Sequence, residues 1–363
     1  MSSSSSNNGI IGGFWPSWYA SSNPPSSIPK LYYTHVFYAF VNPDPGTNYK
    51  LKIDNEGLMH EFTCHLHSNN SSAKAFLAIG GATDEEAQNE AFSAMACKQK
   101  TRGYFIESTI EVARKYGFDG VNLGWEFPYG EEGMNNLVSL LAELRLAVDK
   151  EAHQTGNTKL GIGVSVFFAP DLSLMSSKCR VYPAEVIAAK VDFINVMCYD
   201  YAGHWDTSRT GSIAALYNNS CNYSTSYGIH KWIEGGVPRE KLVMGLPLYG
   251  RTWKLKDRNN NGIGAPAVGT GPQDDKYTIG YMLYHNVMTF NEIHDATVEY
   301  DKETVSYYSH AGTNWISYDG EKSIEAKVKY AKKQRLGGYY FWAIGQDCQD
   351  NRLSTAALNA WRN

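Results

Sequence analysis

The sequence predicts a (β/α)8 TIM barrel of the α/β class with a small α+β insertion between its seventh and eighth strands. Two observations predict the barrel: short apolar runs alternate with longer amphipathic helical patterns, and several of the runs are apolar on both faces. Strands of a parallel sheet that is covered by helices have this character. The third observation is length, because 363 residues exceed the roughly 250 that such a barrel needs.

Eight apolar runs are the candidate strands. Between them, residues 101–117 and 133–150 show apolar side chains at helical spacing, and Gly117 is placed to end the first of these helices. An open, doubly wound sheet is the weaker alternative, since no glycine-rich phosphate loop opens a helix. The predicted strands are 9–15, 34–40, 74–81, 119–127, 160–168, 191–200, 242–250 and 337–345.

The insertion is predicted at residues 252–317. It contains a turn-rich segment, 258–272, followed by two β-like stretches. Residues 1–251 and 318–363 then form the barrel. We expect the insertion to form one wall of a cleft.

Composition excludes several classes of protein. A formal net charge of −4 gives no reason to expect nucleic acid or an anionic membrane as partner. Hydrophobic residues at 43% and charged residues at 19% are typical of a soluble globular chain, and no apolar run approaches the roughly 20 residues of a membrane span. Aromatic residues are abundant at 13%, which suits both a packed core and a sugar-binding cleft.

The cellular compartment is predicted from indirect features. Residues 1–9 lack the pattern of a signal peptide, as a mature secreted chain with an added Met would. Six cysteines form an even set of open connectivity, and four N-x-Ser/Thr sequons lie in polar segments. We therefore expect a secreted or vacuolar glycoprotein whose signal peptide has been removed. The cysteines are Cys64, Cys97, Cys179, Cys198, Cys221 and Cys348, and the sequons begin at Asn69, Asn70, Asn218 and Asn222.

The fourth predicted strand carries the candidate chemistry. Residues two apart on a strand point the same way, so Asn122, Gly124 and Glu126 share one face. The apolar residues between them share the other face, which should meet the helices. Glu126 therefore points into the mouth of the barrel, at the carboxyl end of its strand, where barrel enzymes hold their catalytic groups.

At this point the chain resembles glycoside hydrolase family 18, and within it the class V chitinases of plants. The family pattern D-x-x-D-x-D-x-E aligns without a gap with 119-DGVNLGWE-126. The resemblance covers essentially the whole chain. Its other motifs are 197-MCYD-200, 245-GLPLYGRTW-253, 312-GTNWISYD-319 and 337-GGYYFW-342.

The resemblance implies substrate-assisted cleavage of β-1,4-linked N-acetylglucosamine chains, with no cofactor and no metal ion. Glu126 would be the acid, Tyr199 and Asp200 would bind the acetamide group, and Trp342 would be the floor under the sugar. Phe14 would belong to the aromatic cleft. Met197, Tyr249, Arg251 and Trp253 would line the cleft too, with core packing an equal alternative for Trp253.

Four positions depart from the family pattern together. Asn122 replaces the middle Asp, Gly124 the Asp that orients the acetamide, Ala78 a Ser and Phe14 a Tyr. Each change removes a titratable or hydrogen-bonding group from one small network. Since a half-satisfied buried network is costly, joint loss indicates a site that relaxed after catalysis was no longer needed.

The sequence therefore predicts a chitinase-like carbohydrate-binding protein, a lectin with strongly reduced or absent hydrolysis. It would bind N-acetylglucosamine oligomers or related glycans. A slow but active chitinase is one alternative, favoured by the retained Glu126. A storage or repurposed protein that binds no sugar is the other. Asp206, near the sixth strand, is not predicted as a replacement carboxylate, and oligomeric state stays open.

Overall fold

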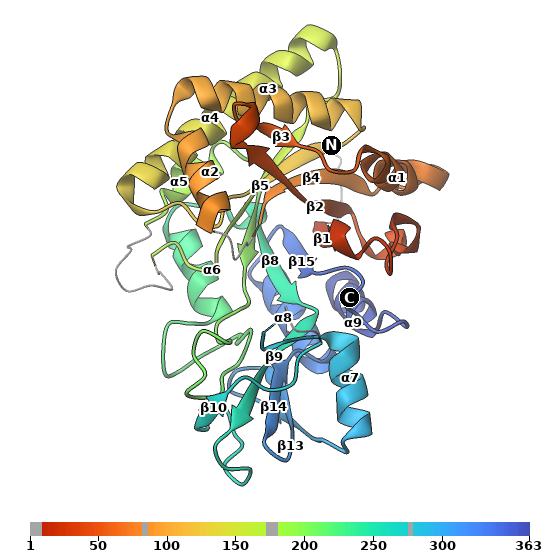
Figure 1. Cartoon of the computed structure of the whole chain (residues 1–363), viewed down its shortest axis with the longest axis vertical. Helices are drawn as coiled ribbons and strands as arrows, with labels where there is room; N and C mark the ends of the chain where they lie inside the picture. The colour runs from red at the N-terminus through yellow and green to blue at the C-terminus, as the bar shows by residue number, and fades with distance from the viewer. Residues whose placement is uncertain (1–8, 82–85, 172–180, 275–278) are drawn as a thin grey trace, which may run out of the picture.

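Eight parallel strands close into a barrel, as predicted (Figure 1). The computed structural model describes residues 9–81, 86–171, 181–274 and 279–363. Closure is complete because β1 pairs with both β2 and β15. All eight predicted strands are confirmed. They are β1 (Ile10–Pro16), β2 (His35–Asp44), β4 (Lys74–Gly80), β5 (Gly120–Gly124), β6 (Gly161–Phe167), β7 (Phe193–Met197), β8 (Leu242–Pro247) and β15 (Gly338–Trp342).

Helices surround this barrel, and the two expected from periodicity are confirmed as α3 and α4. Gly117 follows α3 with φ +74°, the left-handed conformation that ends helices and favours glycine. A short strand, β3 (Lys50–Lys52), pairs antiparallel with the end of β2. The barrel helices are α1 (Glu56–His67), α2 (Glu86–Ala96), α3 (Gln99–Lys115), α4 (Gly130–Thr155), α5 (Ala184–Ala188), α6 (Thr225–Glu234), α8 (Glu321–Lys333) and α9 (Arg352–Arg362).

A second, antiparallel sheet lies between β8 and α8 in the chain and occupies the lower part of Figure 1. Its strand order is β10-β9-β14-β13-β12, with β11 paired to β9. The strands of this sheet begin at Tyr249 and end at Tyr318. The boundaries of a separate domain at residues 252–317 stay a prediction. The elements are β9 (Tyr249–Leu255), β10 (Ala267–Gly269), β11 (Tyr281–Leu283), α7 (Tyr284–Ile293), β12 (Thr297–Asp301), β13 (Ser306–Ala311) and β14 (Asn314–Tyr318).

The interior of the barrel is filled by aromatic side chains. Phe14 stacks on Phe37 with ring centroids 4.5 Å apart, and Phe37 packs against Phe76 at 5.6 Å. Ala78 and Tyr340 belong to the same buried cluster. Large side chains from neighbouring strands thus make the barrel a packed core rather than a pore.

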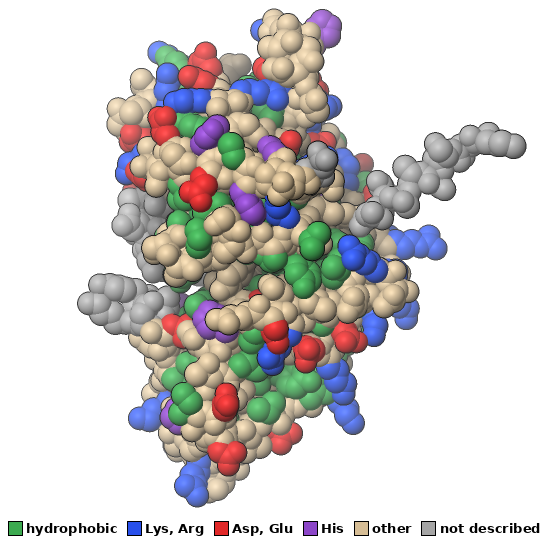
Figure 2. All heavy atoms as spheres, turned by 90° about the vertical axis from the view of Figure 1, so that its right-hand side faces the viewer, with side chains coloured by type: hydrophobic (Ala, Val, Ile, Leu, Met, Phe, Trp, Pro, Cys, Tyr) green, Lys and Arg blue, Asp and Glu red, His purple; other side chains and the backbone are tan. Residues whose placement is uncertain are grey.

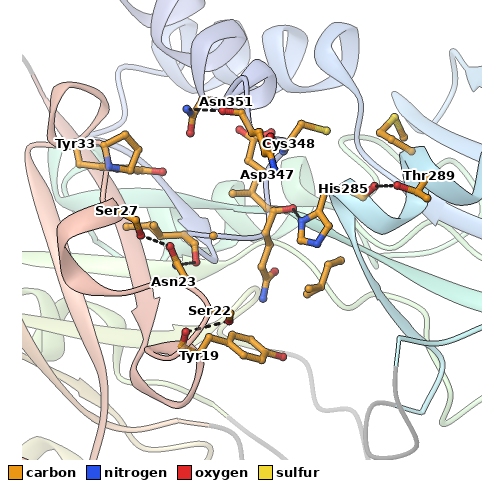
Figure 3. A pocket seen from close by; sticks show the side chains of 18 of the residues that line it. Tyr19, Ser22, Asn23, Ser27, Tyr33, His285, Thr289, Asp347, Cys348 and Asn351 are labelled. Atoms are coloured by element: carbon orange, nitrogen blue, oxygen red, sulfur yellow. Dashed lines mark hydrogen bonds between the residues drawn. The ribbon is translucent and has the colours of Figure 1, made fainter. Parts of the chain in front are cut away.

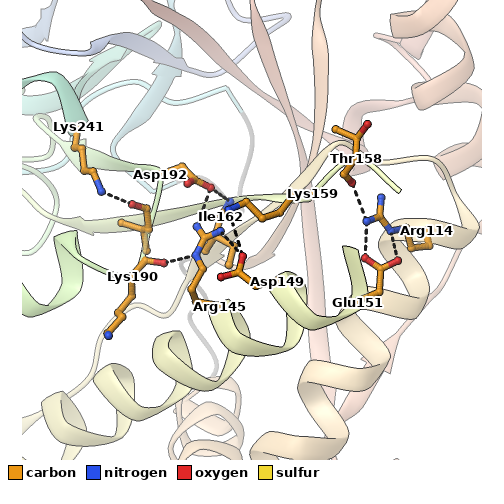
Figure 4. A network of polar contacts seen from close by, with 11 residues as sticks. Arg114, Arg145, Asp149, Glu151, Thr158, Lys159, Ile162, Lys190, Asp192 and Lys241 are labelled. Atoms are coloured by element: carbon orange, nitrogen blue, oxygen red, sulfur yellow. Dashed lines mark hydrogen bonds and ion pairs between the residues drawn. The ribbon is translucent and has the colours of Figure 1, made fainter. Parts of the chain in front are cut away.

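Charged side chains join helices to strands at the amino ends of β6 and β7 (Figure 4). Arg145 on α4 donates to Asp192 at 2.8 Å, and the same carboxylate accepts from the backbone N–H of Ile162 at 2.7 Å. Arg114 on α3 likewise pairs with Glu151 on α4. These contacts lie at the end of the barrel opposite its mouth.

No disulfide bridge joins the cysteines that the structure describes. Acidic and basic side chains are intermixed over the face shown in Figure 2. Cys179 lies outside the described residues, and the five described cysteines are free. Within the described ranges, no helix has both the length and the apolar character that a membrane crossing needs.

One ion pair is enclosed where the second sheet returns to the barrel. Lys327 on α8 donates to both carboxylate oxygens of Asp319 at 2.6 Å, and both side chains are almost completely buried. Burial raises the pKa of Asp319 and lowers the pKa of Lys327, while their mutual attraction opposes both shifts. The pair fixes α8 to the end of β14.

Removing one partner of this pair should destabilise the protein strongly. We expect Lys327→Met to lower the free energy of unfolding by about 3–5 kcal/mol, because Asp319 would be left as an uncompensated buried charge. Chemical denaturation measures the change. Lys329→Met is the matched control, since Lys329 forms an exposed pair with Glu325 and should cost about 1 kcal/mol or less. Equal losses in the two variants would contradict the prediction.

Candidate functional site

The candidate residues meet at the mouth of the barrel. Glu126 follows β5, Tyr199 and Asp200 follow β7, and Trp342 ends β15. Because all eight strands are parallel, their carboxyl ends lie at one end of the barrel. β9 leaves β8 at this same end and brings Arg251 to it. The structure therefore brings the predicted residues from strands four, six, seven and eight to one place.

An ion pair joins the barrel to the second sheet. Arg251 on β9 donates to Asp200 through Nε at 2.8 Å and through Nη2 at 2.9 Å. This two-pronged geometry is the strongest form of a charged hydrogen bond. Burial disfavours the charged guanidinium, yet Asp200 outweighs that effect and the pKa of Arg251 is raised. The Asp200 carboxylate is thus held in one orientation at the mouth.

Three aromatic rings surround the guanidinium of Arg251. Its central carbon lies 5.2 Å from the ring of Trp205, 5.3 Å from Tyr281 and 5.6 Å from Tyr249. Cations are attracted to such ring faces at these distances. Tyr249, which is almost fully buried, also stacks on Tyr281 with centroids 4.3 Å apart. Tyr249 therefore supports Arg251 and Tyr281 from behind.

Tyr199 is held as a neutral hydrogen-bond donor. Its hydroxyl lies 3.1 Å from the hydroxyl of Tyr340. Burial raises the pKa of Tyr199 well above its ordinary value, and the nearby Tyr340, Glu126 and Asp200 raise it further. A phenol that stays protonated can donate a hydrogen bond to a ligand but cannot act as a base near neutral pH.

A cluster of aromatic rings lies beside these polar groups. Trp342 stacks on Phe40 with centroids 5.7 Å apart and planes 14° apart. Trp18 stacks on Phe40 in turn and is 54% exposed. Phe14 lies beneath, 5.6 Å from Trp342, and is buried. Phe14 thus packs under the surface, whereas the rings above it offer faces to a ligand.

A buried, uncharged hydrogen-bond network lies under the mouth. Asn122 donates through Nδ2 to Ser165 at 2.9 Å and accepts from Asn195 Nδ2 at 3.1 Å. Asn195 Oδ1 has no hydrogen-bond partner among the described residues. Ala78, on the neighbouring strand β4, pairs in register with Asn122 and offers no polar group. Asn122 is completely buried, and its amide joins this network without adding any charge.

Gly124 leaves its position on β5 without a side chain, although a Cβ atom would fit. A Cβ built there would lie 3.4 Å from the Gly81 nitrogen, 3.5 Å from the Ile79 oxygen and 4.0 Å from the Ser165 Cβ. These are ordinary van der Waals distances. Packing therefore does not require glycine at this position.

Trp253 and Met197, two further predicted site residues, differ in how deeply they are buried. Trp253, predicted with equal weight as a ligand contact or a core residue, is fully enclosed. It packs against Trp315 at 5.4 Å and donates to the Asp206 carbonyl at 3.0 Å, so it presents no face to a ligand. Met197, by contrast, is half-buried at the end of β7.

Five aromatic residues at or beside the mouth were not anticipated from the sequence. Two of them, Trp18 after β1 and Trp205 in the loop after β7, follow the carboxyl end of a strand, a signal that could have indicated them. Tyr281 had no such signal, because it comes from β11 of the second sheet. The five are Trp18, Phe40, Trp205, Tyr281 and Tyr340.

A cavity of about 780 Å³ adjoins the mouth (Figure 3). Tyr19 and Gln346 line it, and Gln346 Oε1 also accepts from the hydroxyl of Tyr281 at 3.0 Å. Asp347 lines it too, but its carboxylate accepts from the backbone N–H of Ser354 at 2.9 Å in the first turn of α9. The Asp347 carboxylate therefore binds the first turn of α9, whereas Gln346 connects the cavity to Tyr281 in the candidate site.

A closed parallel barrel with an inserted antiparallel sheet and a Glu at the end of its fourth barrel strand defines a class of glycoside hydrolase. The sequence model of glycosyl hydrolases family 18 matches residues 10–347. The chain belongs to this family.

Plant chitinases are among its relatives. The class V chitinase CHIT5 of Lotus japonicus is 42% identical over 357 residues, which cover 98% of this chain and 87% of that protein. A family 18 chitinase from Cycas revoluta, solved in complex with (GlcNAc)3, is 36% identical with a TM-score of 0.89. That alignment covers 97% of this chain and 99% of the Cycas chain.

A chitinase-like agglutinin is also similar. The crystal structure of this protein from Robinia pseudoacacia has a TM-score of 0.87 and 36% identity to the chain. The alignment covers 97% of this chain and 99% of the agglutinin. The fold is thus shared by proteins named as enzymes and by one named as a lectin.

Loss of the Arg251 guanidinium should destabilise the mouth of the barrel. We expect Arg251→Gln to lower the free energy of unfolding by about 1–3 kcal/mol, because Asp200 would lose a charged, two-pronged partner. Chemical denaturation measures the loss. Arg258→Gln, in an exposed turn of the same sheet, is the control and should change stability by about 0.5 kcal/mol or less. A loss no larger than that of the control would refute the role of the pair.

Proposed function

We propose that the chain binds β-1,4-linked N-acetylglucosamine oligomers or related glycans at the mouth of the barrel and hydrolyses them very slowly or not at all. The observation that carries this proposal is the pair of positions before Glu126. Gly124 offers no carboxylate beside it, and Asn122 is a neutral amide bound into a buried network.

The binding part of the proposal is supported by the chemistry of the mouth. The exposed ring of Trp18 and the partly exposed rings of Phe40 and Trp342 suit the C–H faces of sugar rings. Tyr199 offers a hydroxyl donor, and Asp200 a carboxylate held in place. The Cycas complex with (GlcNAc)3 and the Robinia agglutinin support a sugar ligand for this fold.

The catalytic part follows from what the reaction needs. In substrate-assisted cleavage, Glu126 would give its proton to the glycosidic oxygen while the acetamide oxygen of the substrate attacks C1. The C–O bond to the leaving sugar breaks, and a cyclic oxazolinium ion forms that water later opens. Its positive charge calls for a carboxylate two residues before the acid, where this chain has Gly124.

The expected loss of hydrolysis rate follows from the groups that are missing. A positioned electrostatic group is typically worth about 10²–10³ in rate, and general acid catalysis a similar factor. Gly124 removes the first contribution, and the neutral Asn122 removes a charge that would act on Glu126. We therefore infer hydrolysis slower than in an intact family member by roughly three orders of magnitude or more.

Two other functions compete with this proposal. The retained Glu126, Tyr199 and Asp200 favour a slow chitinase. A storage or repurposed protein would leave the mouth without a sugar ligand. We also propose a secreted or vacuolar location, which the sequons and the similarity to plant class V chitinases support.

Calorimetric titration with N-acetylglucosamine oligomers tests the binding. We expect measurable affinity, reduced about tenfold or more by Trp342→Ala, because a central aromatic ring supplies much of the contact energy. Tyr217→Ala, an exposed aromatic on the 198–224 loop that packs against α8, is the control and should bind as the natural chain does. Absence of heat at every oligomer length would favour the repurposed protein. Ordinary turnover in a product assay would favour the chitinase.

Restoring the two carboxylates tests the catalytic part. We expect Asn122→Asp/Gly124→Asp to raise the rate of oligomer hydrolysis by about 10²–10³. The new side chain at position 124 has room for its Cβ. Gly124→Asn is the matched control, because it adds the same bulk without the charge and should stay inactive. If the double variant binds oligomers but cleaves them no faster, these two positions do not account for the loss.

A further inference from the structure

A second groove begins at Trp205, on the flank of the candidate site. It measures about 1000 Å³ and lies between the 201–223 loop and the turn that joins β12 to β13. Trp205 lines the groove and also faces the guanidinium of Arg251. Neither Glu126 nor Trp342 lines it. A chain that leaves the candidate site over Trp205, whose ring is 47% exposed, would enter this groove directly.

The wall of the groove holds a buried hydroxyl group that lacks a protein partner. Ser212 is only 7% exposed, and its Oγ has no hydrogen-bond partner among the described residues. The nearby Thr210 differs, because its hydroxyl donates to the Gly262 carbonyl at 2.8 Å. A buried polar group without a partner is costly, so Ser212 favours a ligand that can bond to it.

The rest of the lining suits a sugar. Tyr223 and Tyr308 contribute half-buried aromatic rings, whereas the third tyrosine of the lining, Tyr201, is buried and hydrogen-bonded to Thr225. Tyr308 is half-buried and stacks on Trp315 with centroids 5.3 Å apart, which fixes its ring. Rings of this kind beside hydroxyl groups are what a sugar with apolar C–H faces and polar edges can contact. The groove volume is also within the range of ligand sites.

Negative charge exceeds positive charge in the groove. Asp206, Asp301 and Glu303 line it, and Arg209 is the one Lys or Arg among its described lining residues. Arg209 lies 3.5 Å from Asp206 and offsets that carboxylate. Asp301 is held in place by the backbone N–H of Thr304 at 2.7 Å, and Glu303 is exposed. Two carboxylates at the β12–β13 turn therefore remain for a cationic group.

We propose that the groove binds a glucosamine unit whose amino group is free and protonated, within a chain that continues from the candidate site over Trp205. This inference rests on the proposed sugar-binding function. The ammonium group supplies N–H donors and positive charge to Asp301 and Glu303, and a sugar hydroxyl bonds to Ser212. An N-acetylated unit carries no such charge. The protein therefore prefers partly de-N-acetylated oligomers to fully acetylated ones of equal length.

Calorimetric titration of the full chain at low ionic strength and pH 6 tests the preference. The probes are the N-acetylglucosamine hexamer, the partly de-N-acetylated hexamer and the N-acetylglucosamine trimer. We expect the partly de-N-acetylated hexamer to bind about three- to tenfold more tightly than the acetylated one, an advantage that added salt reduces. Asp301→Asn/Glu303→Gln should abolish this advantage and leave the affinity for the acetylated hexamer unchanged.

Two further variants make the test specific. Glu299→Gln/Glu325→Gln removes the same charge from exposed positions outside the groove lining, and it should keep the preference. Ser212→Ala should weaken hexamer binding about two- to tenfold and spare the trimer, which is too short to fill both the site and the groove. Equal binding of the two hexamers by the natural chain would overturn this inference alone. No binding of any oligomer would overturn the proposed function and this inference with it.

Discussion

Closure of the barrel is the constraint on which the site depends. β1 is hydrogen-bonded to both β2 and β15, so the barrel has no free edge. Every neighbouring pair of its strands is parallel. Residues as distant in sequence as Glu126 and Trp342 consequently emerge at one mouth. The aromatic packing inside the barrel keeps these strand ends apart at fixed distances.

The second sheet contributes to the site through a charged contact. Arg251 reaches from β9 to Asp200 beyond β7, and the rings of Tyr249 and Tyr281 hold the guanidinium from the side of the insertion. The orientation of Asp200 is thus set by residues from two sheets. Any movement of the insertion relative to the barrel would act first on this carboxylate.

The sequence was sufficient for the barrel and for the strand that precedes Glu126. Strands covered by helices are apolar on both faces, and this pattern is local. The other site residues are placed by contacts between segments that are distant in the sequence, and no local pattern predicts such contacts. Trp253 lies in a motif yet is covered by Trp315 and the 206–210 loop. Trp18 and Tyr281 belong to segments whose approach to the mouth depends on the tertiary fold.

The Asn122 network has a consequence for protons. An amide has a fixed direction, because its nitrogen only donates and its oxygen only accepts. None of Asn122, Ser165 and Asn195 can take up or release a proton near neutral pH. A proton on Glu126 therefore cannot be relayed downward into the barrel through these three residues. This part of the barrel interior therefore carries no charge, whereas a carboxylate at position 122 would have placed a titratable group there.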